Sequence, residues 1–438
     1  MQDSAKLIRI LIYPNITYRK DLTKDSYVDV ISKMLIALNE LRQDLFFYIF
    51  TPEYLDCFNY PNVKQILLDF PSYPNQMRIH FNSEEILAKL PDDIDIVFSH
   101  LPEHTLQLKN LIYNKTEMRP EFFGYCHWFE TKKVTSYEAN VLPINILGLL
   151  NMSVCFLNTE YQKELVLKEV SSYFCKEVLT KLDKLLRVFK LGGQKHLIAN
   201  QIVENTANII AFNHRPDAYK DFDNFIAICD ELYKQRQDFA VWIPLLQTKI
   251  RDYVVIGDYN KLQYYDYLKL CKVGFAPKQE HGGWSVAAVD GLMNGCPYVF
   301  YDASYYRELY PNADFFKNNK EALVLLNKYL DDVEYRNIKA TEALQFVQKE
   351  LTYEKEIEKI SLAIDSCCIE LLDERKNSSL IDKFIDVVKH RGIISKKQLL
   401  KELKLGPRIN FTSIKRNVLA RSNVFEVLSD EPNYIYKT

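Results

Sequence analysis

The sequence predicts an α/β protein in which two doubly wound parallel sheets follow one another along the chain. Three observations point to this fold class. Short, continuous apolar segments, typical of strands that are buried on both faces, alternate with segments whose apolar residues have helical spacing. This alternation pauses near residues 190–194, in the segment KLGGQ, and then begins again. Polar or glycine-rich stretches follow several of the apolar segments, at the strand ends where such sheets bind ligands.

The first predicted domain covers residues 1–190. A helix is expected at Ser83–Leu90, because a serine cap is followed by two glutamates in the first turn. A second helix is expected at Tyr27–Leu41, and a third begins at Glu160. The expected strands are Leu7–Tyr13, Leu45–Phe50, Val63–Asp69, Ile94–Ser99, Phe122–Phe129 and Val154–Leu157.

The second predicted domain covers residues 191–372 and has the same alternation, without sequence repetition of the first. The expected strands are Asn208–Asn213, Phe239–Pro244, Tyr253–Ile256, Val273–Pro277 and Tyr298–Asp302. The expected helices are Phe222–Lys234, Lys261–Leu270, Ser285–Asn294, Lys320–Lys349 and Tyr353–Glu370.

A third, smaller domain is predicted at residues 378–438. Its expected helices are Ser378–Lys389, a segment that Ile394 and Ser395 open and Gly406–Pro407 end, and Asn410–Ser422. A β-hairpin is expected to join Phe425–Leu428 to Tyr434–Lys437. Three short helices followed by a hairpin is the order of a winged helix.

Composition excludes several classes of protein. The net charge of −2 provides no overall field that would attract nucleic acid, but residues 378–438 hold twelve lysines and arginines against six aspartates and glutamates. Nine scattered cysteines without a CxxC pair argue against zinc and suit a reducing compartment. No signal peptide or membrane-spanning segment is recognisable, so we expect a cytoplasmic protein without a membrane partner. Abundant Tyr, Lys, Asn and Ile suggest an AT-rich genome such as that of a bacteriophage.

The stretch Glu280–Pro297, EHGGWSVAAVDGLMNGCP, is the most informative part of the chain. Four of the twelve glycines lie here within fourteen positions, between an apolar strand and a helix. Glycine permits a close approach of the backbone, and a helix N-terminus presents free N–H groups. The stretch therefore predicts an anion site, although a glycine pattern alone also fits an ordinary strand-to-helix turn.

Cationic and acidic side chains surround the same predicted edge of the second sheet. Arg215 follows the strand Asn208–Asn213, and Lys220 lies at the start of the next helix, where both can hold a diphosphate. Asp290 lies on the helix after the glycine-rich stretch, where a carboxylate can accept hydrogen bonds from ribose hydroxyls. Taken singly, each of these residues also fits a solvated surface charge.

Together these segments resemble the GT-B glycosyltransferases that use nucleotide sugars. In that family a strand ends in an Arg, a Lys follows a few residues later, and a Glu, a glycine loop and a Glu-Ala-Met-Ala-x-Gly-x-Pro signature come next. The corresponding segments here are FNHRPDAYKDFDNF and EHGGWSVAAVDGLMNGCP. The resemblance covers about residues 1–372. Its motifs are specific in the second half, whereas the likeness of the first half is loose. It implies two Rossmann-like domains that face a cleft.

The resemblance also implies roles for individual residues. Arg215 and Lys220 would bind the donor diphosphate, and Asp290 would bind the ribose. The donor sugar would be held by residues of the glycine-rich stretch, namely Glu280, Gly282, Gly283 and Trp284. The sequence departs from the family in three places: Asp290 replaces a Glu, Glu280 lies ten positions before it instead of eight, and Pro14–Thr17 replaces the first Gly-Gly turn.

In the first half, His127 ends a predicted strand and in this fold class would face the cleft, near the leaving phosphate or the acceptor hydroxyl. A core histidine beside Trp128 is the plain alternative. His100 and His104 are weaker candidates in a similar position, and Glu130 is a weaker candidate acid or base. No Asp-x-Asp metal motif is apparent, so we expect no metal and no cofactor besides the nucleotide-sugar co-substrate, which we expect to be UDP-glucose or a similar compound.

The excess of basic residues in the third predicted domain suggests that it binds double-stranded DNA. Its candidate contacts with nucleic acid are Lys396, Lys397, Arg408, Lys415, Arg416 and Arg421. A transferase joined to a DNA-binding domain would act on a hydroxymethylated pyrimidine base, 5-hydroxymethylcytosine or 5-hydroxymethyluracil, as phage DNA glycosyltransferases do. The basic face is also compatible with protein interaction or simple solvation. Two alternatives therefore stay open: a transferase for a glycan or small acceptor, and a non-catalytic DNA-binding regulator with a sugar-sensing body.

Overall fold

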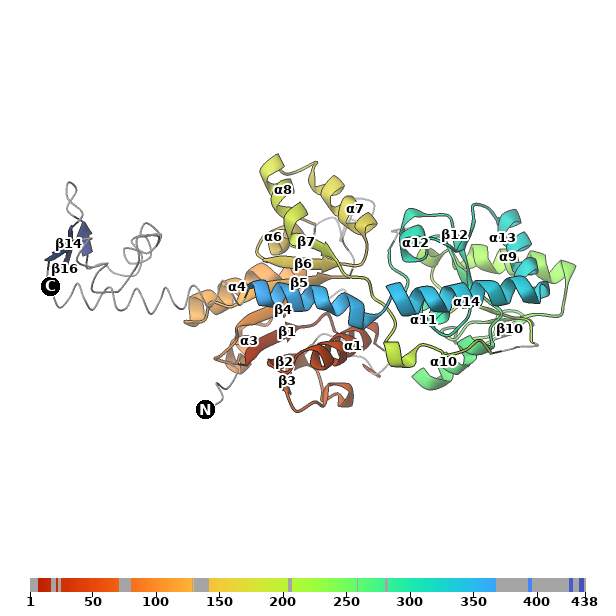
Figure 1. Cartoon of the computed structure of the whole chain (residues 1–438), viewed down its shortest axis with the longest axis horizontal. Coiled ribbons are helices and arrows are strands. Elements are labelled where there is room, and N and C mark those ends of the chain that lie inside the picture. The colour runs from red at the N-terminus through yellow and green to blue at the C-terminus, as the bar shows by residue number, and fades with distance from the viewer. Residues whose placement is uncertain are drawn as a thin grey trace. The chain divides into compact units, whose positions relative to one another are not determined.

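A computed structural model describes residues 7–16, 21–22, 25–70, 80–127, 129, 142–203, 207–257, 259–279, 283–367, 393–395, 425–427 and 433–436. The chain divides into two compact units, residues 1–360 and residues 361–438. The first unit contains both of the predicted parallel sheets (Figure 1).

The first sheet has seven parallel strands in the order β3-β2-β1-β4-β5-β6-β7. The strands are β1 (Ile8–Tyr13), β2 (Leu45–Thr51), β3 (Val63–Leu67), β4 (Ile96–Ser99), β5 (Glu121–Cys126), β6 (Val154–Leu157) and β7 (Leu186–Val188). The chain moves outward from β1 to β3 and then restarts at β4 on the other side of β1. This reversal makes the carboxyl ends of β1 and β4 the position where doubly wound sheets bind ligands.

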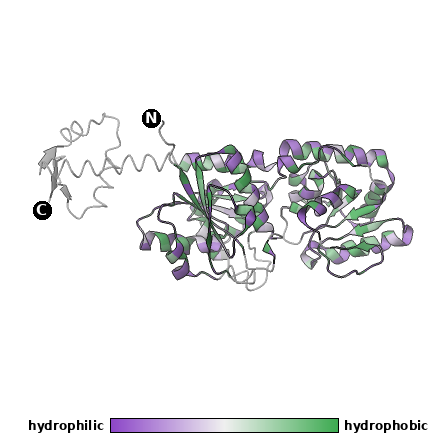
Figure 2. Ribbon diagram, turned by 90° about the horizontal axis from the view of Figure 1, so that it is seen from below, coloured by the Kyte–Doolittle hydropathy of each residue, from purple (hydrophilic) through white to green (hydrophobic). Residues whose placement is uncertain are grey.

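Helices flank this sheet. They are α1 (Ser26–Leu41), α3 (Ser83–Lys89), α4 (Pro102–Lys115), α6 (Leu142–Leu149), α7 (Glu160–Val170) and α8 (Lys176–Leu185). Strand side chains such as Leu11, Val97 and Cys155 are fully buried because helices cover the sheet, and Figure 2 shows hydrophobic strands between helices of mixed polarity. The predicted strands are confirmed, whereas β7 and helices α4, α6 and α8 were not predicted.

The second sheet has six parallel strands in the order β10-β9-β8-β11-β12-β13. The strands are β8 (Ile209–Ala211), β9 (Ala240–Trp242), β10 (Val254–Val255), β11 (Val273–Ala276), β12 (Tyr298–Tyr301) and β13 (Asp314–Phe316). Its order reverses between β8 and β11, and the adjacent carboxyl ends at such a reversal are where doubly wound sheets bind ligands. The sequence predicted all of these strands except β13.

The helices of this half are α9 (Phe222–Gln235), α10 (Lys261–Leu270), α11 (Val286–Met293), α12 (Ser304–Leu309), α13 (Asn319–Asp331) and α14 (Val333–Glu350). The single helix predicted at Lys320–Lys349 is wrong, because the chain forms two helices that meet at Asp332. The side chain of Asp332 accepts a hydrogen bond from the backbone N–H of Tyr335 and thereby caps α14.

The chain passes between the two halves twice, and the two passages bond to each other. The backbone N–H of Gly193 donates to the carbonyl of Leu351 at 2.9 Å, and that of Tyr353 donates to the carbonyl of Gly193 at 3.0 Å. A helix over residues 353–367 follows. Its Glu356 accepts from the backbone N–H of Lys190 at 2.7 Å, and its Lys359 donates to the carbonyl of Val188 at 3.0 Å. This helix therefore bonds to the chain just after the first sheet.

The second unit contains a three-stranded antiparallel sheet in the order β14-β16-β15. Its strands are β14 (Ile393–Ser395), β15 (Phe425–Val427) and β16 (Asn433–Tyr436). The antiparallel pair β15–β16 agrees with the predicted hairpin. Ile394 and Ser395, expected to open a helix, instead pair with β16. The winged helix stays a prediction, since its helices lie outside the described residues.

Candidate donor and acceptor sites

Arg215 and Lys220 lie after the carboxyl end of β8, as the sequence predicted. Lys220 ends the 3-10 turn η4 (Ala218–Lys220), and its ammonium group donates to the side-chain oxygen of Gln279. Burial, together with the nearby Arg215 guanidinium, lowers the pKa of Lys220 to about 7, although Asp217 acts in the opposite direction. Arg215 itself is exposed. The two cations thus lie close enough to interact, and Arg215 disfavours the charged form of Lys220.

Gln279, which the sequence analysis did not select, holds Lys220 in place. Its side-chain amide donates to the hydroxyl of Tyr306 at 2.7 Å, and its backbone N–H donates to the hydroxyl of Tyr305 at 3.1 Å. The hydroxyl of Tyr306 in turn donates to the carbonyl of Pro277 at 2.9 Å. The tyrosines of helix α12 therefore hold Pro277 and Gln279 in the loop after β11. Gln279 in turn orients the amine of Lys220. The one feature of the sequence that could have identified Gln279 is its position immediately before Glu280.

The glycine-rich stretch is described from Gly283 onward, so Glu280 and Gly282 lie outside the described residues. A Cβ atom added to Gly283 would have no described atom within 4 Å. Ser285 caps α11, because its hydroxyl accepts from the backbone N–H of Ala288 at 3.1 Å. The predicted strand and helix on either side of this stretch are thus present as β11 and α11.

Trp284 is buried, and its indole N–H donates to the carbonyl of Leu191 at 2.9 Å. This bond fixes the end of the glycine-rich stretch to the segment that joins the two halves. The indole N–H is already used, so any contact of Trp284 with a donor sugar would come from its ring.

Asp290 lies on α11 and is 5% exposed. Its carboxylate accepts a hydrogen bond from the hydroxyl of Tyr264 at 3.2 Å and lies 3.8 Å from the ammonium nitrogen of Lys261. Asn213, at the end of β8, donates to the hydroxyl of Tyr264 at 2.8 Å and accepts from the hydroxyl of Tyr298 at 2.7 Å. A polar network therefore joins the predicted ribose-binding carboxylate to the carboxyl end of β8.

Lys261 also connects Asp290 to the first half of the chain. Its ammonium nitrogen lies 3.7 Å from Asp29 of α1, and Asp29 forms a second ion pair with Lys33 at 2.8 Å. Burial acts to lower the pKa of Lys261, but the Asp290 and Asp29 carboxylates raise it above its usual value. Lys33, Asp29, Lys261 and Asp290 thus form a row of alternating charges.

His127 and His100 form a pair at the carboxyl ends of β5 and β4. Nδ1 of His100 lies 3.1 Å from Nε2 of His127, and the ring of Tyr27 meets His127 edge-on with centroids 4.5 Å apart. Burial lowers the pKa of both rings, for His100 to about 3, and His100 lowers that of His127 further. Both imidazoles are therefore neutral at pH 7, and one ring donates to the other. His127 is the more accessible, since His100 is 2% exposed.

The other candidates of the first half are placed differently. Nδ1 of His104, on α4, bonds to the hydroxyl of Tyr13 at 2.9 Å, and both side chains are buried. This contact makes His104 part of the packing between β1 and α4. Glu130 lies outside the described residues.

The six basic residues proposed to contact nucleic acid all lie outside the described residues. They are Lys396, Lys397, Arg408, Lys415, Arg416 and Arg421. The structure thus leaves them as sequence-based predictions.

In the described part of the chain, no group of three or more His, Cys, Asp or Glu side chains is arranged to hold a metal ion. Among the described helices, none is long and apolar enough to cross a membrane.

Two parallel sheets of this order, joined by two passages of the chain, define the GT-B fold, and comparison with solved structures agrees. A trehalose-6-phosphate synthase, OtsA, superposes with a TM-score of 0.60 at 14% identity, over 82% of this chain and 99% of that one. HepE from Anabaena, in complex with UDP and glucose, gives a TM-score of 0.58 at 10% identity, over 82% of this chain and all of that one. At these identities the likeness shows the fold.

A trehalose-6-phosphate synthase from Burkholderia multivorans is similar to the same degree, with a TM-score of 0.60 at 9% identity over 84% of this chain and 100% of that chain. No known family profile matches the sequence, and no curated protein matches it. The motif correspondence in the second half therefore carries the assignment of individual residues.

Proposed function

We propose that the protein is a glycosyltransferase that moves a sugar from a nucleoside-diphosphate sugar, UDP-glucose or a similar donor, to a hydroxyl group. The observation that carries this proposal is the contact of Lys220 with Gln279 in the loop after β11, with Arg215 nearby, at the point where the strand order reverses. Solved proteins with this fold support it, since HepE binds UDP and glucose and one trehalose-6-phosphate synthase binds UDP-2-fluoro glucose.

Lys220 and Arg215 would act on the leaving diphosphate. Glycosyl transfer passes through an oxocarbenium-like transition state, in which negative charge develops on the departing phosphate oxygens. Lys220, which Gln279 orients, Arg215 and the N–H groups at the start of α11 would stabilise that charge. A bound diphosphate would also raise the pKa of Lys220, because its negative charge would add to that of Asp217.

Asp290 would bind the ribose of the donor. Lys261 and Tyr264 both contact its Oδ2 atom and would hold the carboxylate in position. His127 would face the acceptor, since it is the more accessible member of the histidine pair. A neutral imidazole at that position can accept the proton of an attacking hydroxyl or donate a hydrogen bond to it.

For the acceptor, we propose a hydroxymethylated pyrimidine base in DNA. This proposal is supported by the excess of basic residues in residues 378–438 and by the antiparallel sheet β14-β16-β15, whose β15–β16 pair would correspond to the wing. A small or glycan acceptor is the second candidate. It is favoured by the trehalose-6-phosphate synthases, which match 82% and 84% of this chain.

Donor use and acceptor choice can be tested in one experiment. The full-length protein is incubated with radiolabelled nucleotide sugars and with DNA that contains 5-hydroxymethylcytosine or 5-hydroxymethyluracil, and unmodified DNA serves as the control. We expect label to enter the modified DNA alone. Transfer to sugars or sugar phosphates but not to DNA would select the second candidate, and absence of any turnover would leave a sugar-sensing protein.

A further inference from the structure

Helix α12 of the second half contacts the start of helix α7 in the first half, and the two helices lie side by side in Figure 1. Both carboxylate oxygens of Glu308 take part: Oε1 accepts from the backbone N–H of Glu160 at 2.8 Å, and Oε2 accepts from that of Tyr161 at 3.2 Å. The ring of Tyr161 also meets that of Tyr305, with centroids 5.6 Å apart. The contact therefore combines a bidentate carboxylate with an aromatic pair.

The Glu308 carboxylate completes the first turn of α7. The first N–H groups of a helix have no partner inside the helix. The hydroxyl of Thr159 accepts from one of them, the N–H of Gln162, at 2.9 Å. Glu308 accepts from the two that precede it, and a negative charge is favourable at a helix N-terminus. The start of α7 is thus held by a residue that is 148 positions away in the chain.

The same turn of α7 is bonded to the end of β5, where His127 lies. Asn158 immediately precedes the cap Thr159 and is 5% exposed. Its side-chain amide donates to the carbonyl of His127 at 2.9 Å, and its side-chain oxygen accepts from the hydroxyl of Tyr125. Its backbone N–H donates to the side-chain oxygen of Gln162 at 3.2 Å. The start of α7 and the backbone of His127 therefore form one hydrogen-bonded unit.

Helix α12 also supports the candidate donor site. The hydroxyls of Tyr305 and Tyr306 accept from the backbone N–H and the side-chain amide of Gln279. Gln279 in turn accepts from the ammonium group of Lys220. Tyr305 belongs to both contacts, because its ring meets Tyr161 of α7 while its hydroxyl binds Gln279. One short helix therefore connects the start of α7 to Lys220.

We propose that Glu308 is a positioning residue for glycosyl transfer, an inference that rests on the function proposed above. By bonding α12 to the start of α7, Glu308 holds His127 and Lys220 in one geometry, so that both can act on the same substrate complex. A displacement of about 1 Å between reacting groups can cost on the order of a hundredfold in rate. The Glu308 carboxylate is occupied by two backbone N–H groups, so it acts through these contacts and not on the substrates.

Hydrogen exchange of the full-length protein, measured by mass spectrometry with and without UDP, tests this inference without turnover. Bound UDP should hold Lys220 and, through α12, slow amide exchange at the start of α7 in the wild type. The amide of Glu308→Gln can accept from one N–H group but directs its own N–H groups at the other. The start of α7 should therefore exchange faster in this variant, and UDP should no longer slow it.

Kinetics provide a second readout that a purely structural role would not produce. Glu308→Gln should lower kcat about tenfold or more, while the dissociation constant of UDP stays within about threefold. In a His127→Ala background the same substitution should have a much smaller effect on kcat, because Glu308 acts through the position of that histidine. Tyr161→Leu, which removes the ring contact with Tyr305, should act in the same direction, so the result does not depend on one variant.

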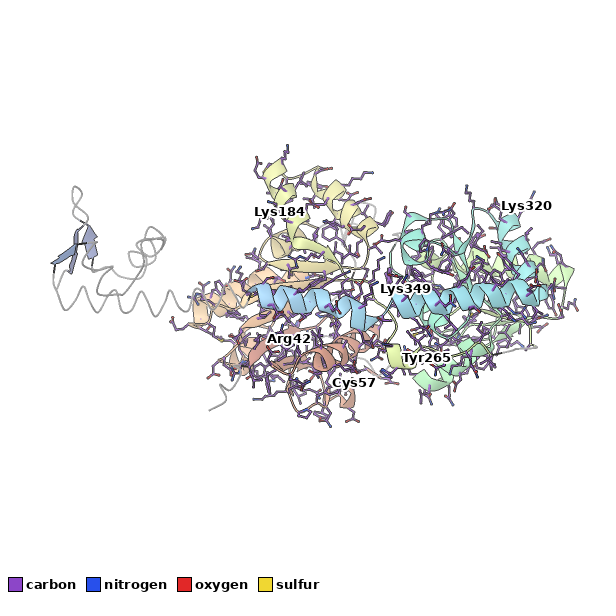
Figure 3. The ribbon with its side chains drawn as sticks, in the orientation of Figure 1. Arg42, Cys57, Lys184, Tyr265, Lys320 and Lys349 are labelled. Carbon is purple, nitrogen blue, oxygen red and sulfur yellow. The ribbon has the colours of Figure 1, made fainter. Side chains whose placement is uncertain are left out.

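Two controls change exposed side chains of the first half: Glu164→Gln on α7 and Lys184→Gln on α8, where Figure 3 labels Lys184. Both should behave as the wild type does. The inference alone would be overturned by UDP binding that leaves exchange at the start of α7 unchanged, or by a loss of kcat in Glu308→Gln that is equally large in the His127→Ala background. Absence of UDP binding to the wild type in titration calorimetry would refute the proposed function, and this inference with it.

Discussion

The ammonium group of Lys220 is held by the side-chain oxygen of Gln279, which in turn is fixed by two tyrosines of α12. The bond joins the loop after β8 to the loop after β11, and these strands are neighbours in the sheet. It orients the amine without neutralising it, because an amide carries no net charge. Lys220 is therefore positioned for an anion before any anion arrives.

The first prediction concerns the charge of Lys220. Lys220→Met should lower kcat/KM for nucleotide-sugar turnover about a hundredfold or more, because removing a donor from developing negative charge has effects of that size. Arg215→Ala should act in the same direction. Steady-state kinetics with a fixed acceptor would measure both. Lys278→Met is the control, since Lys278 is an exposed lysine in the loop after β11; rates equal to the control would refute the assignment.

The second prediction concerns pH. The pKa of Lys220 is lowered to about 7, and a diphosphate binds best to the protonated amine. The dissociation constant of UDP should therefore rise as the pH rises above about 7, with a limiting slope of about tenfold per pH unit. Isothermal titration between about pH 6.5 and 9 would measure this slope. A Lys220→Met variant should lack it, and a wild-type affinity independent of pH would contradict the role of the amine.

The third prediction uses the neighbour of Lys220. Gln279→Glu places a carboxylate against the amine, so the pKa of Lys220 should rise and the alkaline loss of UDP binding should move to higher pH. Affinity near pH 7 should fall at the same time, because the new carboxylate competes with the diphosphate. Gln279→Leu leaves the hydroxyl of Tyr306 without this partner and should weaken binding with no upward displacement of the profile. Identical profiles in both variants would show that Gln279 does not control Lys220.

The fourth prediction separates acceptor chemistry from donor binding. His127→Ala should lower kcat about a hundredfold, in the range of general acid–base catalysis, while the dissociation constant of UDP stays within about twofold. His196→Ala is a matched control, because His196 is exposed and outside the pair. If His127→Ala loses UDP binding and activity together, the histidine pair has a structural role instead.

The fifth prediction concerns the charged row between α1 and α11. Lys261→Met leaves Asp29 and Asp290 with one cation fewer and should lower the free energy of unfolding by about 1 kcal/mol, since the lysine is half-exposed and its ion pairs are long. Lys33 and Lys261 hold the pKa of Asp29 below its usual value although burial opposes them. The contribution is therefore present above the unfolded-state pKa and is lost as the pH falls through the folded one.

Denaturant titrations at about pH 7 and pH 3, with Lys249→Met as an exposed control in the second half, would measure this difference. The loss should also shrink in high salt, because screening weakens half-exposed pairs. A loss that is independent of both pH and salt would point to packing instead of charge.

Periodicity predicted both sheets because buried parallel strands are short and uniformly apolar, as in β1 and β11. It also predicted that Arg215, Lys220 and Asp290 lie near the carboxyl ends of the strands, which is where doubly wound sheets bind ligands. Segments with a weaker local signal were missed. Strand β13 has three residues, and α12 has six. Asp332 interrupts the single helix that was expected. Nothing in the local sequence distinguishes it from other acidic helix residues, and its role as a cap follows from its non-helical backbone conformation.

The partners of the site residues could not be predicted from sequence. Gln279 is 59 positions from Lys220, and Lys261 is 232 positions from Asp29, so no local pattern pairs them. The contact between His100 and His127 depends on β4 and β5 being adjacent in register. Such contacts follow from the fold as a whole.

The helix that begins at residue 353 has a consequence for dividing this protein genetically. A fragment that stops at residue 190 would lack Glu356, the acceptor for its own backbone N–H at Lys190, and would lose the ring contact between Phe189 and Tyr353 at 6.1 Å. A fragment of residues 191–372 would include that helix, but Glu356 and Lys359 would lack their partners at Lys190 and Val188. The first folding module is therefore discontinuous in sequence, and an independent acceptor-side protein would need the helix restored, for example by a short linker after residue 190.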